Sequence, residues 1–198
     1  MEGKLQNSSK QRFGTKQITT IGMLSGISIM LGITGYGFIP LPGVKATILH
    51  IPVIIGAILE GPIIGMMIGL IFGIFSVIQA MMMPTPLSFA FMNPLVAVLP
   101  RVIIGITSYY AYKFLPIKSQ NIKIGIGTAI GSLTNTFGVL TMVYLLYAAR
   151  FAQTIKIPES TAAKAIYGIA VTNGLPEAAV AIVITIPVIA AVKKIRKR

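Results

Sequence analysis

Six long apolar segments take up most of the chain, and they limit its possible folds more than any motif does. They cover residues 17–38, 46–59, 62–82, 94–114, 122–149 and 165–192. A helix needs roughly 20 apolar residues to cross a bilayer core about 30 Å thick. Apolar residues make up 55% of the chain and charged residues 11%, which leaves too little polar surface for a soluble domain. The sequence therefore predicts an all-α polytopic membrane protein, with six transmembrane helices in one bundle.

The distribution of basic residues predicts how the bundle is oriented. Most of the Lys and Arg residues lie at the two ends of the chain and between the fourth and fifth segments. Short loops rich in Lys and Arg stay on the cytoplasmic side of a membrane. We therefore expect cytoplasmic N- and C-termini, with an N-terminal tail at 1–16, a transmembrane domain at 17–192 and a basic tail at 193–198. The second segment is short and contains Pro52, so we do not expect it to cross alone as a regular helix.

The net charge of +13 does not indicate a nucleic-acid partner. The basic residues flank the apolar segments, and the C-terminal KKIRKR run suits the anionic headgroups of a lipid bilayer. The chain has no cysteine, so disulfides and thiolate metal sites are excluded. With a single histidine, His50, no His-rich metal site is expected, and no cofactor is predicted.

An energy source for uphill transport is not evident in this chain. It has no GxxxxGK[ST] loop for ATP, and it lacks the motifs of a serine hydrolase, so it is not expected to be an enzyme. Of its four acidic residues, only Glu177 lies well inside an apolar segment, which is little for a proton or sodium relay. A membrane-embedded binding protein that takes its energy from partners is the simplest interpretation.

Small residues four positions apart indicate close helix packing in membranes. Gly22 and Gly26 form such a pair in the first segment, and they suit either internal packing or the docking of another protein. The third segment carries a ladder of glycines and the fifth a shorter pair, for which internal packing is the expected role. These glycines are Gly61, Gly65, Gly69, Gly73, Gly127 and Gly131.

Polar residues inside the apolar segments mark a candidate binding site, because they are costly to bury in a membrane. Arg101 lies two turns into the fourth segment, so it should meet a carboxylate, either of Glu177 or of a ligand. The loop before it, MMMPTPLSFAFMNP, is predicted to cover an apolar ligand body. The candidate ligand-binding residues are Lys45, His50, Phe91, Asn93, Arg101, Asn135, Tyr147, Asn173 and Glu177.

Several of these residues also have a purely structural interpretation. Arg101 and Glu177 could form a buried ion pair with each other, and the asparagines in the spans could bond between helices. His50 fits an interfacial histidine and Lys45 a solvated loop charge. The Asn-Gly-Leu-Pro run at 173–176 predicts a local unwinding of the sixth segment.

Three stretches of the sequence are similar to a known family, the substrate-binding S components of energy-coupling factor (ECF) vitamin transporters. They are ATILHIPVIIGAILEGPIIG, GLIFGIFSVIQA and SFAFMNPLVAVLPRVIIGITSYYAY. Gly22 and Gly26 occupy the place of the AxxxA signature that these proteins carry on their first helix. The resemblance covers nearly the whole chain.

The resemblance implies a function that composition alone does not supply. S components bind a vitamin outside the cell membrane of a prokaryote, then associate with a transmembrane coupling subunit and two ATPase subunits. It implies that Gly22 and Gly26 face the coupling subunit, and that the bundle topples to deliver its vitamin.

The ligand of this chain is expected to be pantothenate, because the sequence most resembles the pantothenate-type branch. Arg101 or Lys45 would take its carboxylate and the three asparagines its polar groups. Riboflavin or another vitamin remains an alternative, supported by the aromatic residues Phe89, Phe91, Tyr144 and Tyr147. The alternative from another class is a stand-alone secondary transporter that works through Glu177.

Overall fold

The computed structural model describes residues 14–41 and 44–196, and within that range the protein is a helical bundle with one short hairpin. The elements are α1 (Thr15–Thr34), β1 (Phe38–Leu41), β2 (Val44–Thr47), α2 (Ile51–Glu60), α3 (Pro62–Met82), α4 (Ser88–Phe91), α5 (Pro94–Ala97), α6 (Leu99–Phe114), α7 (Gln120–Ile155), the 3₁₀ helix η1 (Glu159–Thr161) and α8 (Ala162–Arg196). The predicted helical class is therefore confirmed. The predicted N-terminal tail lies outside the described residues as far as residue 13, and α8 continues into the predicted basic tail.

Five stretches within the described residues are long and apolar enough to cross a membrane. They are Thr15–Thr34, Pro62–Met82, Pro94–Phe114, Gln120–Ile155 and Glu159–Arg196. The second predicted segment instead folds into β2 and the ten-residue helix α2, which at 1.5 Å per residue is only about 15 Å long. Residues 51–58 of α2 are all buried, which is the setting in which a short helix is tolerated at membrane depth.

The hairpin is the one departure from an all-α fold among the described residues. β1 and β2 pair antiparallel, with Phe38 opposite Thr47. The first helix ends before the predicted boundary at 38 because Gly35 adopts a left-handed conformation, with φ of 76°, after Thr34. This turn sends the chain out of the bundle and into β1.

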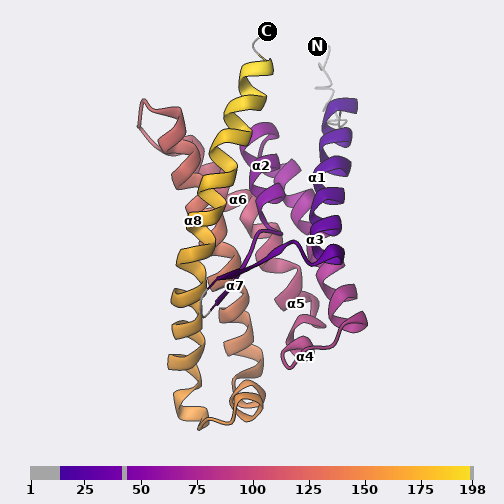
Figure 1. Ribbon diagram of the computed structural model, residues 1–198, viewed down its shortest axis with the longest axis vertical. Helices are drawn as coiled ribbons and strands as arrows, with labels where there is room; N and C mark the ends of the chain where they lie inside the picture. The colour runs from indigo at the N-terminus through magenta and orange to yellow at the C-terminus, as the bar shows by residue number, and fades with distance from the viewer. Residues whose placement is uncertain (1–13, 42–43, 197–198) are drawn as a thin grey trace, which may run out of the picture.

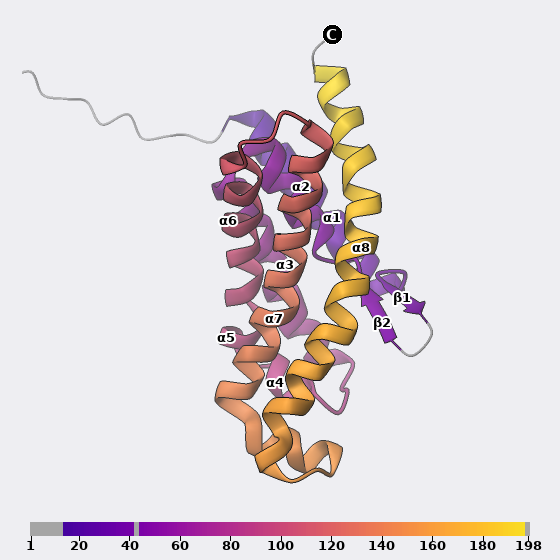
Figure 2. The same ribbon diagram turned by 90° about the vertical axis from the view of Figure 1, so that its left-hand side faces the viewer.

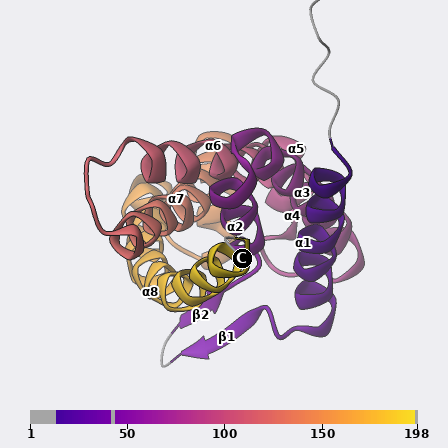
Figure 3. The same ribbon diagram turned by 90° about the horizontal axis from the view of Figure 1, so that it is seen from above.

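The two ends of the described chain lie at the same end of the molecule (Figure 1), with the start of α1 and the end of α8 side by side in the view. α4 and the connection from α7 to α8 lie toward the opposite end. The hairpin projects beside α8 (Figure 2), and α2 lies among the longer helices when the bundle is seen from above (Figure 3). At the shared end, the Glu60 carboxylate forms an ion pair with the guanidinium of Arg196 and lies 3.6 Å from the ammonium of Lys16. One carboxylate therefore links α1, α2 and α8.

Close glycine contacts hold the centre of the bundle together. A Cβ on Gly69 would lie 2.2 Å from the backbone oxygen of Arg101, and one on Gly105 would lie 2.4 Å from the nitrogen of Met66. A Cβ on Gly131 would likewise lie 2.9 Å from the Cβ of Ser108. The expected packing role is confirmed for the other glycines of the ladder and for the pair in α7, but it is wrong for Gly61, which has no atom within 4 Å of a Cβ among the described residues and instead forms the turn before α3 with φ of 105°.

Two predicted features of the helices differ in the structure. The expected unwinding at 173–176 is wrong, because α8 is continuous through Pro176. The proline removes one backbone hydrogen bond, while Gly174 packs against Leu133 and Thr136 of α7 and keeps the helix in place. The interruption lies instead in α7, where Tyr147 has non-helical dihedral angles of φ −141° and ψ 23°.

Candidate binding site

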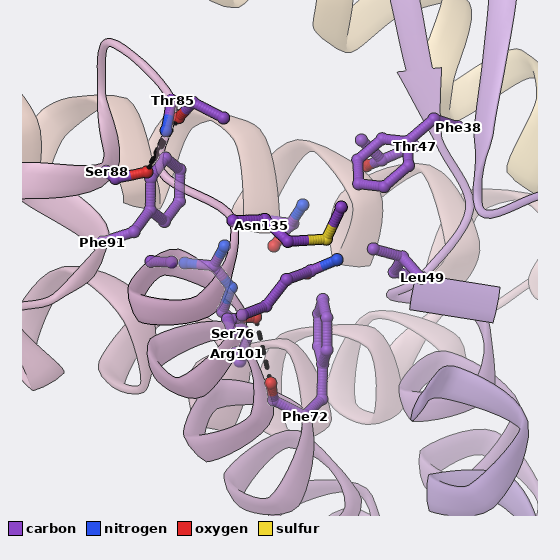
Figure 4. Close-up of a pocket in the computed structure, with 13 residues that line it drawn as sticks. Phe38, Thr47, Leu49, Phe72, Ser76, Thr85, Ser88, Phe91, Arg101 and Asn135 are labelled. Atoms are coloured by element: carbon purple, nitrogen blue, oxygen red, sulfur yellow. Dashed lines mark hydrogen bonds between the residues drawn. The ribbon is translucent and has the colours of Figure 1, made fainter. Parts of the chain in front are cut away.

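A cavity of about 360 Å³ lies between the hairpin, the end of α3, the loop to α4, the start of α6 and the middle of α7. Ligand pockets in proteins commonly fall in the range of roughly 300–1,000 Å³. Figure 4 shows how the side chains from these separate elements face a common space. Its lining residues are Phe38, Thr47, Leu49, Phe72, Ser76, Gln79, Ala80, Met83, Thr85, Ser88, Phe91, Arg101 and Asn135.

Arg101 supplies the positive charge in the wall of the cavity. Its side chain is buried, and its Nη1 donates to the backbone oxygen of Val96 at 2.8 Å, which fixes the side chain against α5. Its guanidinium lies 5.6 Å from the ring centroid of Phe72 and 5.4 Å from that of Phe91. Its Nε has no hydrogen-bond partner among the described residues. A buried guanidinium held in this way is suited to binding a carboxylate.

The remaining polar groups of the wall are neutral. Asn135 is buried in α7, and its Oδ1 has no hydrogen-bond partner within the described part of the chain. Gln79 donates to the backbone oxygen of Gly32 at 3.0 Å. Ser88 accepts from the backbone nitrogen of Thr85 at 2.6 Å, which closes the loop after α3. The cavity thus offers one cation, an unused amide oxygen and hydroxyls between aromatic rings.

Glu177 lies next to the cavity rather than in its wall. Its Oε1 accepts from the backbone nitrogen of Thr47 at 3.0 Å, and its Oε2 accepts from the hydroxyl of Thr136 at 2.7 Å. Within the described residues it forms no ion pair with Arg101 at 4 Å or less. The ion-pair interpretation is therefore wrong, and Glu177 instead ties the hairpin to α7 and α8.

Asn93 and Tyr147 meet each other outside the lining. Asn93 donates to the hydroxyl of Tyr147 at 3.1 Å, and its Oδ1 caps α5 by accepting from the nitrogen of Leu95 at 3.0 Å. Tyr147 also packs edge-on against Phe89, with 5.5 Å between ring centroids. The pair holds α4 and α5 against α7, and so supports the helix α4 that carries Phe91 into the cavity.

The other predicted residues are not brought to the cavity wall. His50 is fully buried and bonds through Nε2 to the hydroxyl of Ser132 at 3.0 Å, so its interfacial interpretation is wrong. Asn173 is half-buried in α8 and does not line the cavity. Lys45 belongs to β2, and its side chain lies outside the described part of the structure.

Several lining residues escaped the sequence analysis. Gln79 carried a signal, since it is a large polar side chain near the end of an apolar helix. Phe38 and Thr47 carried none, because the hairpin that brings them to the cavity was not predicted.

Gly22 and Gly26 lie on an open face of α1. A Cβ at either position would have no atom within 4 Å among the described residues, unlike at Gly65, Gly69 or Gly105. This separates the α1 pair from the glycines that pack inside the bundle.

Five of the described helical stretches have the length and apolarity of membrane-spanning helices, which is the pattern of a membrane protein. Residues 16–189 match the family described as "ECF transporter, substrate-specific component", and the chain belongs to this family. It is 34% identical over 171 residues to the "Pantothenic acid transporter PanT" of Lactococcus lactis subsp. cremoris, covering 79% of this chain and 82% of the relative. It is 28% identical over 169 residues to the "Pantothenate transporter PanT" of Leuconostoc mesenteroides subsp. mesenteroides, covering 81% and 83%. Membership of this family makes the chain a transport protein of a bacterial membrane.

Proposed function

We propose that this chain captures pantothenate outside the cell and delivers it for ATP-driven uptake by a transmembrane coupling subunit and two ATPase subunits. The observation that carries the proposal is the guanidinium of Arg101, which is buried in the cavity wall and whose Nε has no hydrogen-bond partner among the described residues. Pantothenate is a small anion with hydroxyl and amide groups. Its carboxylate suits Arg101, and an N–H or O–H of the vitamin suits the unused Oδ1 of Asn135. The names of the two relatives support the same ligand.

The proposed topology has six crossings with both termini in the cytoplasm. The start of α1 and the end of α8 lie at one end (Figure 1), so the chain must make an even number of passes. The five long apolar stretches supply five of them, and the hairpin followed by α2 returns the chain between α1 and α3. The basic residues near the shared end, among them Lys193, Lys194 and Arg196, support a cytoplasmic location for it.

The proposed coupling surface is the face of α1 that carries Gly22 and Gly26. Nothing within the described residues covers these glycines, and Met23, Ile27 and Met30 are exposed on the same helix. Small residues four apart allow the backbone of another helix to come close. The face therefore suits a helix of the coupling subunit.

The alternatives of the sequence analysis find less support in the geometry. A relay through Glu177 would need a carboxylate free to exchange protons, whereas both of its oxygens already accept hydrogen bonds. Of the four aromatic residues that support riboflavin, Phe91 lines the cavity, whereas Phe89, Tyr144 and Tyr147 do not.

Calorimetry with the purified chain and a panel of vitamins tests the proposed ligand. We expect tight binding of pantothenate and no binding of riboflavin or folate at the same concentrations. Vesicles that contain the chain alone should not accumulate pantothenate, and uptake should require the coupling and ATPase subunits. Tight binding of another vitamin would refute the ligand, and gradient-driven uptake by the chain alone would refute the mechanism.

A further inference from the structure

Two lysines from different helices converge on Tyr112, near the end of α6. Lys193 of α8 donates from Nζ to the hydroxyl of Tyr112 at 2.5 Å and lies 4.5 Å from its ring centroid. Lys123, in the first turns of α7, lies 5.7 Å from the same centroid. The Tyr112 hydroxyl in turn donates to Oε1 of Gln120 at 2.9 Å, so the ring is held in place. The three side chains are half-buried where α6, α7 and α8 meet.

No carboxylate balances these two charges in the part of the chain that the structure describes. The ion pairs found there both use Glu60, which is already shared by Lys16 and Arg196. Lys123 lies in the first turn of α7, near the positive end of the helix dipole, and that turn contains no acidic residue. Two ammonium groups at one aromatic ring repel each other, and an anion between them would relieve that repulsion.

Exposed apolar side chains also lie on these helix ends, on other sides than the lysine–tyrosine cluster. Phe114 and Ile195 are each 72% exposed, and Ile122 is 52% exposed. They lie within three residues in sequence of Tyr112, Lys193 and Lys123 respectively. A pair of cations at the end of a bundle of apolar helices fits a molecule that has an anionic head and hydrocarbon tails, whereas free phosphate would make no use of the exposed apolar helix surfaces.

We propose that Lys123 and Lys193 bind the headgroup phosphate of an anionic phospholipid, with its acyl chains along the exposed apolar surfaces of the neighbouring helices. Basic pockets between the ends of transmembrane helices are known to take such headgroups. The site lies at the end of the bundle where α8 ends, near the level expected for a membrane surface (Figure 1). It depends on the membrane location of the chain and is independent of the vitamin.

Thermal unfolding of the full chain in detergent, titrated with phosphatidylglycerol or phosphatidylcholine, tests the site. Phosphatidylglycerol should raise the melting temperature of the wild type more than phosphatidylcholine does. The Lys123→Gln/Lys193→Gln variant should need about 30-fold more phosphatidylglycerol for half of this shift. Lys194→Gln is the matched control, because Lys194 is an exposed neighbour with no hydrogen bond or ion pair among the described residues.

Further arms decide between a lipid, a free anion and a folding defect. Lys123→Gln alone keeps the Lys193 bond to Tyr112, and it should weaken the lipid effect about fivefold even if the double variant does not fold. Equal lipid responses of Lys123→Gln and Lys194→Gln would overturn the proposal. So would an equal shift produced by inorganic phosphate without lipid. Pantothenate calorimetry on the same variants should be unchanged, which separates this site from the vitamin cavity.

Discussion

Replacing Arg101 by glutamine is the most direct test of the vitamin cavity. In the structure, Nη1 is already occupied by the backbone oxygen of Val96. Nε has no partner among the described residues, and no hydrogen bond of Nη2 is found there. Nε and Nη2 form one side of the guanidinium fork, so they can bind both oxygens of a carboxylate at once. Arg101→Gln removes this side and the charge, and leaves a shorter side chain that is still polar.

The expected loss of affinity follows from these two bonds. A hydrogen bond to a charged group contributes about 1.5–3 kcal/mol, so two such bonds give a loss of about 3 kcal/mol at the lower bound. Since 1.4 kcal/mol corresponds to a factor of ten, Arg101→Gln should weaken pantothenate binding about 100-fold. Arg101→Lys should lose less, about tenfold, because it keeps the charge while losing the planar contact with Phe72 and Phe91.

Calorimetry with two ligands separates a lost contact from a general defect. The second ligand is the alcohol analogue of pantothenate, in which a hydroxymethyl group replaces the carboxylate. The wild type should prefer the acid strongly, while Arg101→Gln should bind acid and alcohol about equally. Lys164→Gln, a change at an exposed cation of α8, is the control and should behave as the wild type. If Arg101→Gln folds and keeps the wild-type preference for the acid, the assignment of the carboxylate to Arg101 is refuted.

Three further predictions test the other elements of the site and the bundle. Glu177→Gln should keep most of the pantothenate affinity. Glu177→Leu should lower the melting temperature, because the donors of Thr47 and Thr136 lose their acceptor at a cost of about 1–3 kcal/mol each. Loss of uptake with intact binding in Glu177→Gln would instead favour a proton relay. Gly69→Ala should lower the free energy of unfolding by about 1–3 kcal/mol, because its Cβ would lie 2.2 Å from a backbone oxygen. A variant as stable as the wild type would show that the helices can separate. Gly22→Leu should abolish uptake in vesicles with the partner subunits while leaving calorimetric binding unchanged, and a parallel loss of binding would make Gly22 a packing residue.

The long helices could be predicted because a single property, sustained apolarity, decides them. The predicted bounds 62–82 coincide with α3, which begins at Pro62 after the turn at Gly61 with φ of 105°. α7 extends beyond the predicted end at 149, since Phe151 and Ala152 are buried and continue the helix. The hairpin could not be predicted, because strands of four residues give too few positions for an alternating pattern.

The site was predictable in its residue types but not in its pairings. Arg101, Asn135 and Phe91 line one cavity, and each was selected because a polar or aromatic side chain stood out in its segment. The partner of His50 is Ser132, 82 positions away, and only the packing of α2 against α7 brings them together. Asn93 did carry a local signal, since asparagine before a proline is typical of a helix N-cap, and it serves that purpose in α5.

The glycine contacts also distinguish α1 from the helices at the centre of the bundle. α3 and α6 approach closely at Gly69 and Gly105, where the backbone of each helix contacts a glycine of the other. Neither helix could move away without losing these backbone contacts. α1 instead packs through Ser25, Ser28 and Gly32, and only these three of its residues are buried. Gly22 of the same helix is exposed, and a Cβ there would have no atom within 4 Å among the described residues. If a partner docks on α1 as proposed, it contacts a helix that takes no part in the close contact of α3 with α6. The helices around Arg101 then need not rearrange when the partner binds.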